Sequence, residues 1–133
     1  MKSLLGYIWA SPNTLLGLIC VALTLLTGGK AQIVDGVIEA RGGLTRLVLR
    51  SFPIGPGGAS AMTLGHVVLG QDERCHDRSR RHERVHVAQY ARYGPLFLLV
   101  YGLSSLYCLC TGQDPYRGNF LESEAYRVDS SLE

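Results

Sequence analysis

The chain has 133 residues, which is the length of one domain with room for one modest core. A hydrophobic fraction of 47% is high for a soluble protein, whereas 18% charged residues is too many for a chain made only of membrane spans. These values favour apolar segments joined to a polar domain. A formal net charge of +2, without a basic run interleaved with aromatic residues, excludes nucleic acid as the expected partner.

Residues 1–29 are predicted to form an N-terminal membrane anchor. No charged residue lies between Ser3 and Gly29, and 15–26 is the most apolar part, after a break at 11–13. The residues that follow this stretch lack the A-x-A-like pattern of a signal-peptide cleavage site, so we favour a retained anchor. Because the apolar core is shorter than the roughly 20 residues of a comfortable span, flanking residues extend it or the segment forms a short hairpin.

Residues 30–70 are predicted to be β structure. Asp35-Gly36 lies between β-branched pairs, a pattern typical of a hairpin turn. Residues 51–58 form a Pro/Gly loop in which regular strand pairing is not expected. Residues 61–69 then read as one further strand, with Gly65 marking a bulge or a close backbone approach.

The C-terminal half is predicted to be helical. No Gly or Pro interrupts 72–92, and the helix is expected to end at Gly94-Pro95. An apolar helix or hairpin follows at 95–111, and a short helix capped by Asn119 completes the chain. The predicted fold class is therefore α+β, with the anchor at 1–29 and one domain at 30–133.

The polar helix contains the pattern HExxH at His82, Glu83 and His86. Two histidines four residues apart lie on one helix face, so both imidazoles can bind one ion, and neutral nitrogen ligands suit Zn²⁺. Glu83 lies about 100° round the helix from His82, beside the metal position, where a carboxylate can take a proton from a bound water. The pattern predicts metal ligands at His82 and His86 and a catalytic base at Glu83.

A catalytic zinc ion also needs a third protein ligand and one open position. With Glu122-Ser123-Glu124-Ala125-Tyr126 downstream, the chain resembles the gluzincin branch of the zincin metallopeptidases, which combine HExxH with a later Glu, often within E-x-x-A-D. By that match Glu122 is the third ligand and Glu124 is the alternative. Tyr126 stands where the family pattern has Asp, so this resemblance assigns no role to residue 126.

The resemblance extends upstream of the HExxH helix. Residues 61–68, followed by a polar stretch and HExxH with Gln89 three residues later, look like a small peptidase domain associated with bacterial extracellular contractile injection and toxin systems. This similarity covers roughly 60–92. It implies a minimal zincin-like domain with a short sheet, an HExxH helix and a C-terminal Glu-bearing helix, and it implies a bacterial cell membrane as the location.

Five further residues are candidates near the metal. Gln89 and Tyr93 share the face of the two histidines by helical angle, which suits residues that orient the ligands. His66 and Tyr126, like Tyr90 and Tyr93, are candidates for stabilising an oxyanion, although side chains of these types more often serve in ordinary packing. The arginines of the same helix are interpreted as a solvated surface or as contacts to anionic lipid headgroups: Arg74, Arg78, Arg80, Arg81, Arg84 and Arg92.

The three-ligand hypothesis constrains the apolar segment at 95–111. If this segment crossed a bilayer, Glu122 would lie roughly 30 Å from the histidines. The segment must therefore be a buried helix, a hairpin broken near 102–105, or an element lying in the membrane interface.

The sequence leaves two functions open. The first is a membrane-associated zinc-dependent metallopeptidase, with membrane lipid and a peptide or protein substrate as partners. The second is a non-catalytic membrane protein with a structural or vestigial metal site that serves in assembly or interaction. The sequence does not define the substrate or the oligomeric state.

Overall fold

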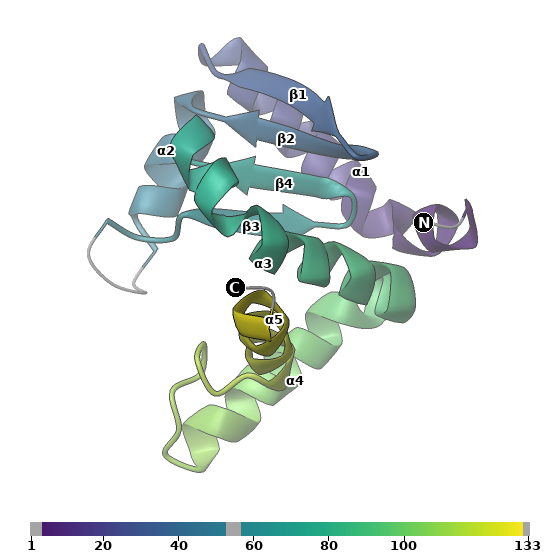
Figure 1. Ribbon diagram of the computed structural model, residues 1–133, viewed down its shortest axis with the longest axis vertical. Helices are drawn as coiled ribbons and strands as arrows, with labels where there is room; N and C mark the ends of the chain where they lie inside the picture. The colour runs from purple at the N-terminus through teal and green to yellow at the C-terminus, as the bar shows by residue number, and fades with distance from the viewer. Residues whose placement is uncertain (1–3, 53–56, 132–133) are drawn as a thin grey trace.

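A four-stranded mixed sheet with the strand order β1-β2-β4-β3 forms the centre of the α+β fold (Figure 1). The computed structural model describes residues 4–52 and 57–131. In chain order, the elements are α1 (Leu4–Leu26), β1 (Lys30–Val34), β2 (Val37–Arg41), α2 (Gly43–Arg50), β3 (Ala61–Leu64), β4 (Val67–Gly70), α3 (Glu73–Tyr93), a 3-10 turn (Gly94–Leu96), α4 (Phe97–Cys110) and α5 (Phe120–Ser131). Strands β2 and β4 pair in parallel, and the two outer pairs are antiparallel.

Both faces of the sheet are covered, as the alternation of side chains along the strands shows. Ala40, Val67 and Leu69 pack with Val21 of α1. Residues of the opposite parity, such as Val37 and Val68, pack with Val87 of α3. Because successive residues of a strand point to opposite faces, α1 covers one face and α3 covers the other (Figure 1).

The buried face of helix α1 is a stripe of mostly small residues spaced three or four apart: Gly6, Ala10, Asn13, Gly17, Val21 and Thr24. A Cβ atom at Gly17 would lie 2.7 Å from the Cβ of Val67, so the helix approaches the sheet closely there. The large apolar residues of α1 point outward. The helix is long and apolar enough to cross a membrane, as is the helical stretch Glu73–Cys110, although a core helix or a signal sequence passes the same test.

The break expected at 11–13 does not occur, because α1 continues through Pro12. Proline has no N–H to donate to the carbonyl of Ile8 one turn earlier. The hydroxyl of Ser11 donates to that carbonyl instead, at 2.6 Å. A side chain thus replaces the missing backbone hydrogen bond and keeps the helix continuous.

Two details of the predicted β region are wrong. Residues 43–50 form α2, whose Leu49 is buried, rather than a strand. Residues 61–69 form the two antiparallel strands β3 and β4 rather than one, because Gly65 has a φ of +63° at the first turn position between them. The hairpin at Asp35-Gly36 is confirmed, and both residues have positive φ. Of the expected loop at 51–58, residues 53–56 lie outside the described part of the chain.

Helix α3 has the predicted bounds, with Asp72 capping its N-terminus through the backbone N–H of Cys75 at 2.8 Å. Its position on the sheet is set by Glu39 of β2, which is fully buried. Arg80 donates to both carboxylate oxygens of Glu39, at 2.8 and 2.9 Å, and Arg84 donates to one of them at 2.9 Å. The interpretation of these two arginines as a solvated surface or lipid contacts is therefore corrected: they anchor α3 to the sheet.

Of the alternatives for the apolar segment after α3, the hairpin broken near 102–105 does not form, because the segment is one continuous helix, α4. Ser104 and Ser105 at that position bind the start of α5 instead. The hydroxyl of Ser104 accepts from the backbone N–H of Phe120 at 3.1 Å, and that of Ser105 accepts from the Asn119 amide at 2.8 Å. Helix α5 consequently lies between α3 and α4 (Figure 1).

Replacing Glu39 by Gln tests this anchor. Burial opposes the charge of Glu39, but the hydrogen bonds from Arg80 and Arg84 outweigh it and lower its pKa from 4.5 to about 2. The stabilisation from the ionised carboxylate is therefore complete above pH 4.5 and is lost as the pH falls through about 2. We expect Glu39→Gln to lower the free energy of unfolding by about 2 kcal/mol at pH 7, measured by chemical denaturation, with the difference shrinking below pH 4.5.

Glu73→Gln is the matched control, because the Glu73 side chain is 63% exposed and lies 3.9 Å from Arg41. An exposed pair of this kind contributes less than about 1 kcal/mol. Equal effects of the two substitutions at pH 7 would contradict the role given to Glu39.

Candidate metal centre

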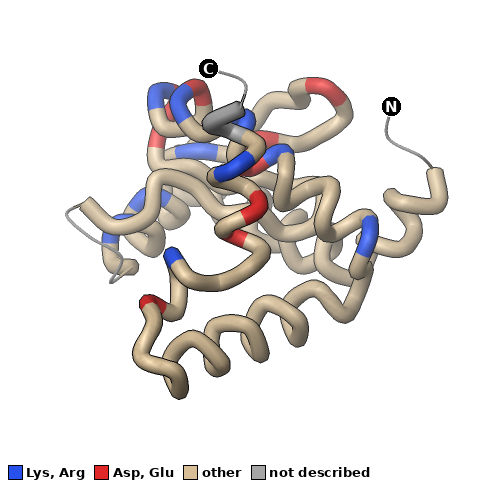
Figure 2. Tube along the Cα trace, turned by 60° about the horizontal axis from the view of Figure 1, so that its bottom comes forward, with Lys and Arg blue, Asp and Glu red and all other residues tan. Residues whose placement is uncertain are grey.

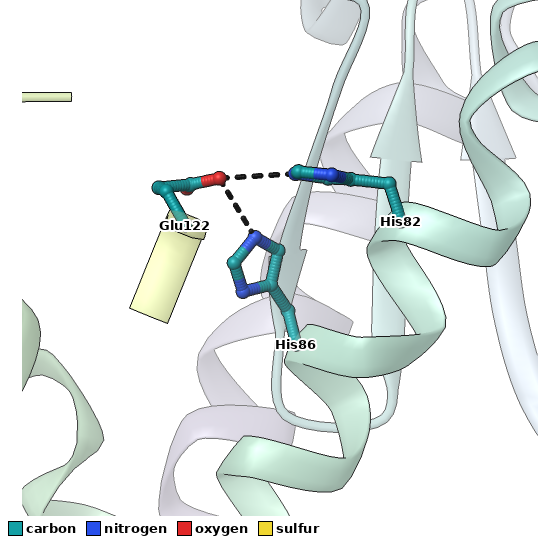
Figure 3. Close-up of side chains that lie close together, drawn as sticks. All are labelled: His82, His86 and Glu122. Carbon is teal, nitrogen blue, oxygen red and sulfur yellow. Dashed lines mark hydrogen bonds and ion pairs between the residues drawn. The ribbon is translucent and has the colours of Figure 1, made fainter. Parts of the chain in front are cut away.

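His82 and His86 lie one turn apart on the face of α3 that points away from the sheet and toward α5. Their ring centroids are 5.0 Å apart, and both side chains are buried. The two rings converge on one point rather than on separate partners (Figure 3).

Glu122 of α5 meets both rings at that point. Its Oε1 lies 3.0 Å from Nε2 of His82 and 3.1 Å from Nε2 of His86 (Figure 3). Glu124, the alternative ligand, lies elsewhere: its Oε1 accepts from the Gln89 amide at 2.9 Å, and its Oε2 lies 3.8 Å from Arg92. The structure thus brings Glu122, and not Glu124, to the histidines. Helix α4 returns the chain to the same side, as the three-ligand hypothesis requires.

The three side chains fit a small divalent cation by their chemistry and spacing. Each offers one ligand atom, and these atoms all lie within 4.8 Å of one another. Tetrahedral ligands with bonds of about 2.0 to 2.1 Å lie about 3.3 Å apart, close to the 3.0 and 3.1 Å that separate the carboxylate oxygen from the two ring nitrogens. Two imidazoles and one carboxylate form the ligand set that suits zinc in hydrolytic enzymes.

Gln89 orients His86 so that its Nε2 can bind a metal ion. Its Oε1 accepts from Nδ1 of His86 at 2.8 Å, which places the hydrogen of a neutral ring on Nδ1 and leaves the lone pair of Nε2 facing the cluster. The Gln89 amide nitrogen donates to the backbone oxygen of Leu121 at 3.0 Å. Gln89 therefore ties α3 to α5 one residue before Glu122, consistent with the ligand-orienting role expected for it.

Glu83 lies beside the cluster on the sheet side of α3. Its Oε2 accepts from the hydroxyl of Thr63 on β3 at 2.7 Å, and the side chain is buried. Burial raises the pKa of Glu83, and the nearby His86 and His82 only partly oppose this. A carboxylate with a raised pKa is a better proton acceptor, which is the property that the predicted base requires.

A cavity of about 470 Å³ opens at this centre. Residues of β3, α3, α4 and α5 line it, and Glu83 and the three candidate ligands are among them. Thr63, Tyr101 and Tyr116 also line the cavity, and sequence reasoning did not identify them. No local pattern marks these three residues, because only the tertiary fold brings them to the histidines.

Of the remaining candidate residues, Tyr126 lies at the histidines, whereas His66 and Tyr93 do not. Tyr126 packs its ring on His82 with centroids 4.4 Å apart, and its hydroxyl lies 3.3 Å from that of Tyr116. His66 and Tyr93 are not among the described residues that line the cavity. His66 stacks on Tyr7 at 3.9 Å in the β3–β4 turn, and Tyr93 packs beside the core of Tyr90 and its neighbours, so neither position brings the side chain to the metal centre.

The hydrogen bonds of the cluster predict a pH dependence of the metal-free chain. Burial alone would lower the pKa of His86, but the hydrogen bond and charge of Glu122 outweigh it and raise the pKa from 6.5 to about 9. The stabilisation is complete below pH 6.5 and is lost as the pH rises through about 9. Denaturation in the presence of a chelator should show a stability loss of about 1 to 3 kcal/mol over this range.

Glu122→Gln provides the comparison for that experiment, because a neutral amide does not hold the proton on His86. The variant should show a flatter dependence over the same pH range. An equally steep loss in the variant would show that the wild-type dependence comes from another group.

Comparison with known proteins identified no relative of the chain. No family model, no curated protein and no solved structure matches the chain. The resemblance to zincin peptidases consequently depends on the HExxH and downstream Glu residues and on the geometry of their side chains.

Proposed function

We propose that the chain is a membrane-associated, zinc-dependent metallopeptidase. The observation that carries the proposal is the convergence of His82, His86 and Glu122 within 4.8 Å beside a buried Glu83. Ligands and base come from the residues expected for HExxH chemistry, and they face one cavity. The combination supports hydrolysis more specifically than the sequence pattern alone, since a chance HExxH has no reason to meet a third ligand.

Different residues of the chain would have different roles in the proposed hydrolysis. Zinc, when bound, supplies a Lewis acid that lowers the pKa of a coordinated water to about 7 and polarises the substrate carbonyl. Glu83 takes the proton of the attacking water and then delivers it to the nitrogen of the leaving amine. The Thr63 hydroxyl holds one oxygen of Glu83, which leaves the other free for this transfer.

Strand β3 offers a binding mode for the proposed peptide substrate. The strand lies at the edge of the sheet, pairs with β4 within the described residues, and lines the cavity through 61–63. An extended peptide can add to such an edge through main-chain hydrogen bonds. Bound there, its backbone would pass in front of Glu83 and the histidines.

A non-catalytic protein with a structural metal site, or none, is the second candidate. One observation favours it: Glu122 already accepts from both imidazoles, so these polar groups are satisfied without an ion. Such a protein would serve as an assembly or interaction module at the membrane. Metal binding and hydrolysis separate it from the peptidase.

Membrane association is proposed from the outer faces of α1 and α4. Neither helix contains a charged residue, and Figure 2 shows α4 without charge along the lower edge of the molecule. Its outward side chains include Leu103 and Leu106, which are 57% and 55% exposed. Since the inner side of α4 binds α5, the helix is best suited to lie in the interface with its outer side in lipid.

Glu83→Gln is the central test of the peptidase. The glutamine is nearly the same size and is not one of the three ligands, so the variant should bind one equivalent of zinc like the wild type. Without a base, cleavage of fluorescein-labelled casein should fall by about 100-fold or more. Zinc is measured by elemental analysis of the purified full-length chain, and unchanged cleavage would refute the assignment of Glu83.

Glu122→Ala and Glu124→Ala form a matched pair for the metal itself. Only Glu122 meets the histidines, so its loss should weaken zinc binding, whereas the Glu124 variant should retain the ion. A wild-type chain that binds no zinc and cleaves nothing would favour the second candidate.

The lipid contact of α4 is tested with a double variant, Leu103→Lys and Leu106→Lys. Burying a leucine in an apolar phase contributes about 1.5 to 3 kcal/mol, so partitioning onto vesicles should fall at least about tenfold. Vesicles of phosphatidylcholine and phosphatidylglycerol are sedimented with the full-length chain. Leu47→Lys on α2, at a side chain 66% exposed, is the control, and equal losses for both variants would contradict a specific role of α4.

A further inference from the structure

The two oxygens of Glu122 have different partners. Oε1 faces the imidazoles of His82 and His86, at 3.0 and 3.1 Å. Oε2 accepts a hydrogen bond from the hydroxyl of Tyr101, at 2.7 Å. Tyr101 comes from α4, so a helix that supplies no ligand determines how the carboxylate is turned.

The backbone of Tyr101 also holds the start of α5. Its carbonyl oxygen accepts from the side-chain amide of Asn119 at 2.9 Å. Asn119 caps α5 through the backbone N–H of Leu121 at 3.0 Å, one residue before Glu122. Tyr101 therefore contacts both the chain that carries Glu122 and the carboxylate itself, which fixes the position and the rotation of the group.

The rotation matters because a carboxylate can bind a metal ion through one oxygen or through two. A catalytic zinc site keeps one of its four positions for water beside three protein ligands. A second oxygen from Glu122 would occupy or crowd that position. A hydrogen bond from Tyr101 to Oε2 competes with such binding, because the lone pairs of Oε2 are directed to the hydroxyl.

We propose that Tyr101 is a positioning residue that makes Glu122 bind the metal through Oε1 alone and thereby keeps the water position open. The inference rests on the proposed zinc site. It extends that site to a residue of α4 and gives this helix a part in metal binding beyond its apolar outer face.

Tyr116 provides the matched control. It lines the same cavity and, like Tyr101, is half-buried, but its hydroxyl lies 3.3 Å from that of Tyr126 and makes no hydrogen bond with Glu122. Tyr116→Phe thus removes a hydroxyl from the same surroundings without changing the partners of the carboxylate.

The experiment uses Co²⁺ as the probe in the full-length chain. Cobalt absorbs visible light strongly in a four-coordinate site and weakly when the coordination number rises. Titration against a chelating dye gives the affinity. We expect Tyr101→Phe to bind cobalt about 10- to 100-fold more weakly than the wild type and with a weaker visible band, whereas Tyr116→Phe matches the wild type in both.

The outcomes distinguish this inference from the proposed function. A wild-type chain that binds no cobalt would overturn the metal site and this inference with it. A wild type that binds cobalt, together with a Tyr101→Phe variant of unchanged spectrum, would overturn the one-oxygen role alone, even if affinity fell. Circular dichroism of the metal-free variants checks folding, and Tyr101→Gln, whose side chain is too short to replace the phenol, is expected to show the same changes if the phenylalanine variant does not fold.

Discussion

The contact between Glu39 and the two arginines of α3 is the constraint on which the candidate metal centre depends. Arg80 and Arg84 lie one turn apart and hold the same buried carboxylate, so α3 cannot rotate on the sheet without breaking both interactions. At 100° per residue, His82 and His86 then point almost directly away from these arginines. The ion pairs of Glu39 on the sheet side of α3 thus direct the imidazoles of His82 and His86 toward α5 on the opposite side of the helix.

Helices α4 and α5 complete the arrangement from the opposite side. The serines of α4 bind the first residues of α5, and Gln89 of α3 binds the backbone just before Glu122. Glu122, the proposed third ligand, is therefore held between two helices. The same α4 exposes its other side, so an apolar surface and the metal centre lie on opposite sides of one helix.

Local signals made part of this structure predictable. HExxH marks one helix face by spacing alone, Asp35-Gly36 permits the positive φ of a tight turn, and Gly94-Pro95 ends α3 because proline lacks a donor. Glu122 was proposed because residues 122–126 resemble the downstream Glu motif of gluzincins. In each case the chemistry depends on residues that are close in sequence.

What could not be predicted depends on contacts between distant residues. Glu39 is a single acidic residue in a strand, and nothing nearby shows that it would be buried against arginines 41 and 45 residues later. Tyr101 lies in an apolar stretch of the sequence. A tyrosine in such a stretch is normally interpreted as a packed core residue or as a residue at a membrane interface. The sequence did not predict α2, because residues 44–49 are as rich in β-branched and aliphatic side chains as a strand. Only the burial of Leu49 against its neighbours decides for the helix.

The hydrogen bonds between Glu122 and the two imidazoles have a consequence for the loading of the site. Where a ring donates through Nε2, that nitrogen carries a proton that an incoming cation has to displace. Cation uptake and proton release are then coupled, so the metal-free cluster keeps its proton at neutral pH and below and releases it as the pH rises through about 9. Metal binding at the proposed site would therefore depend on the pH of the surroundings.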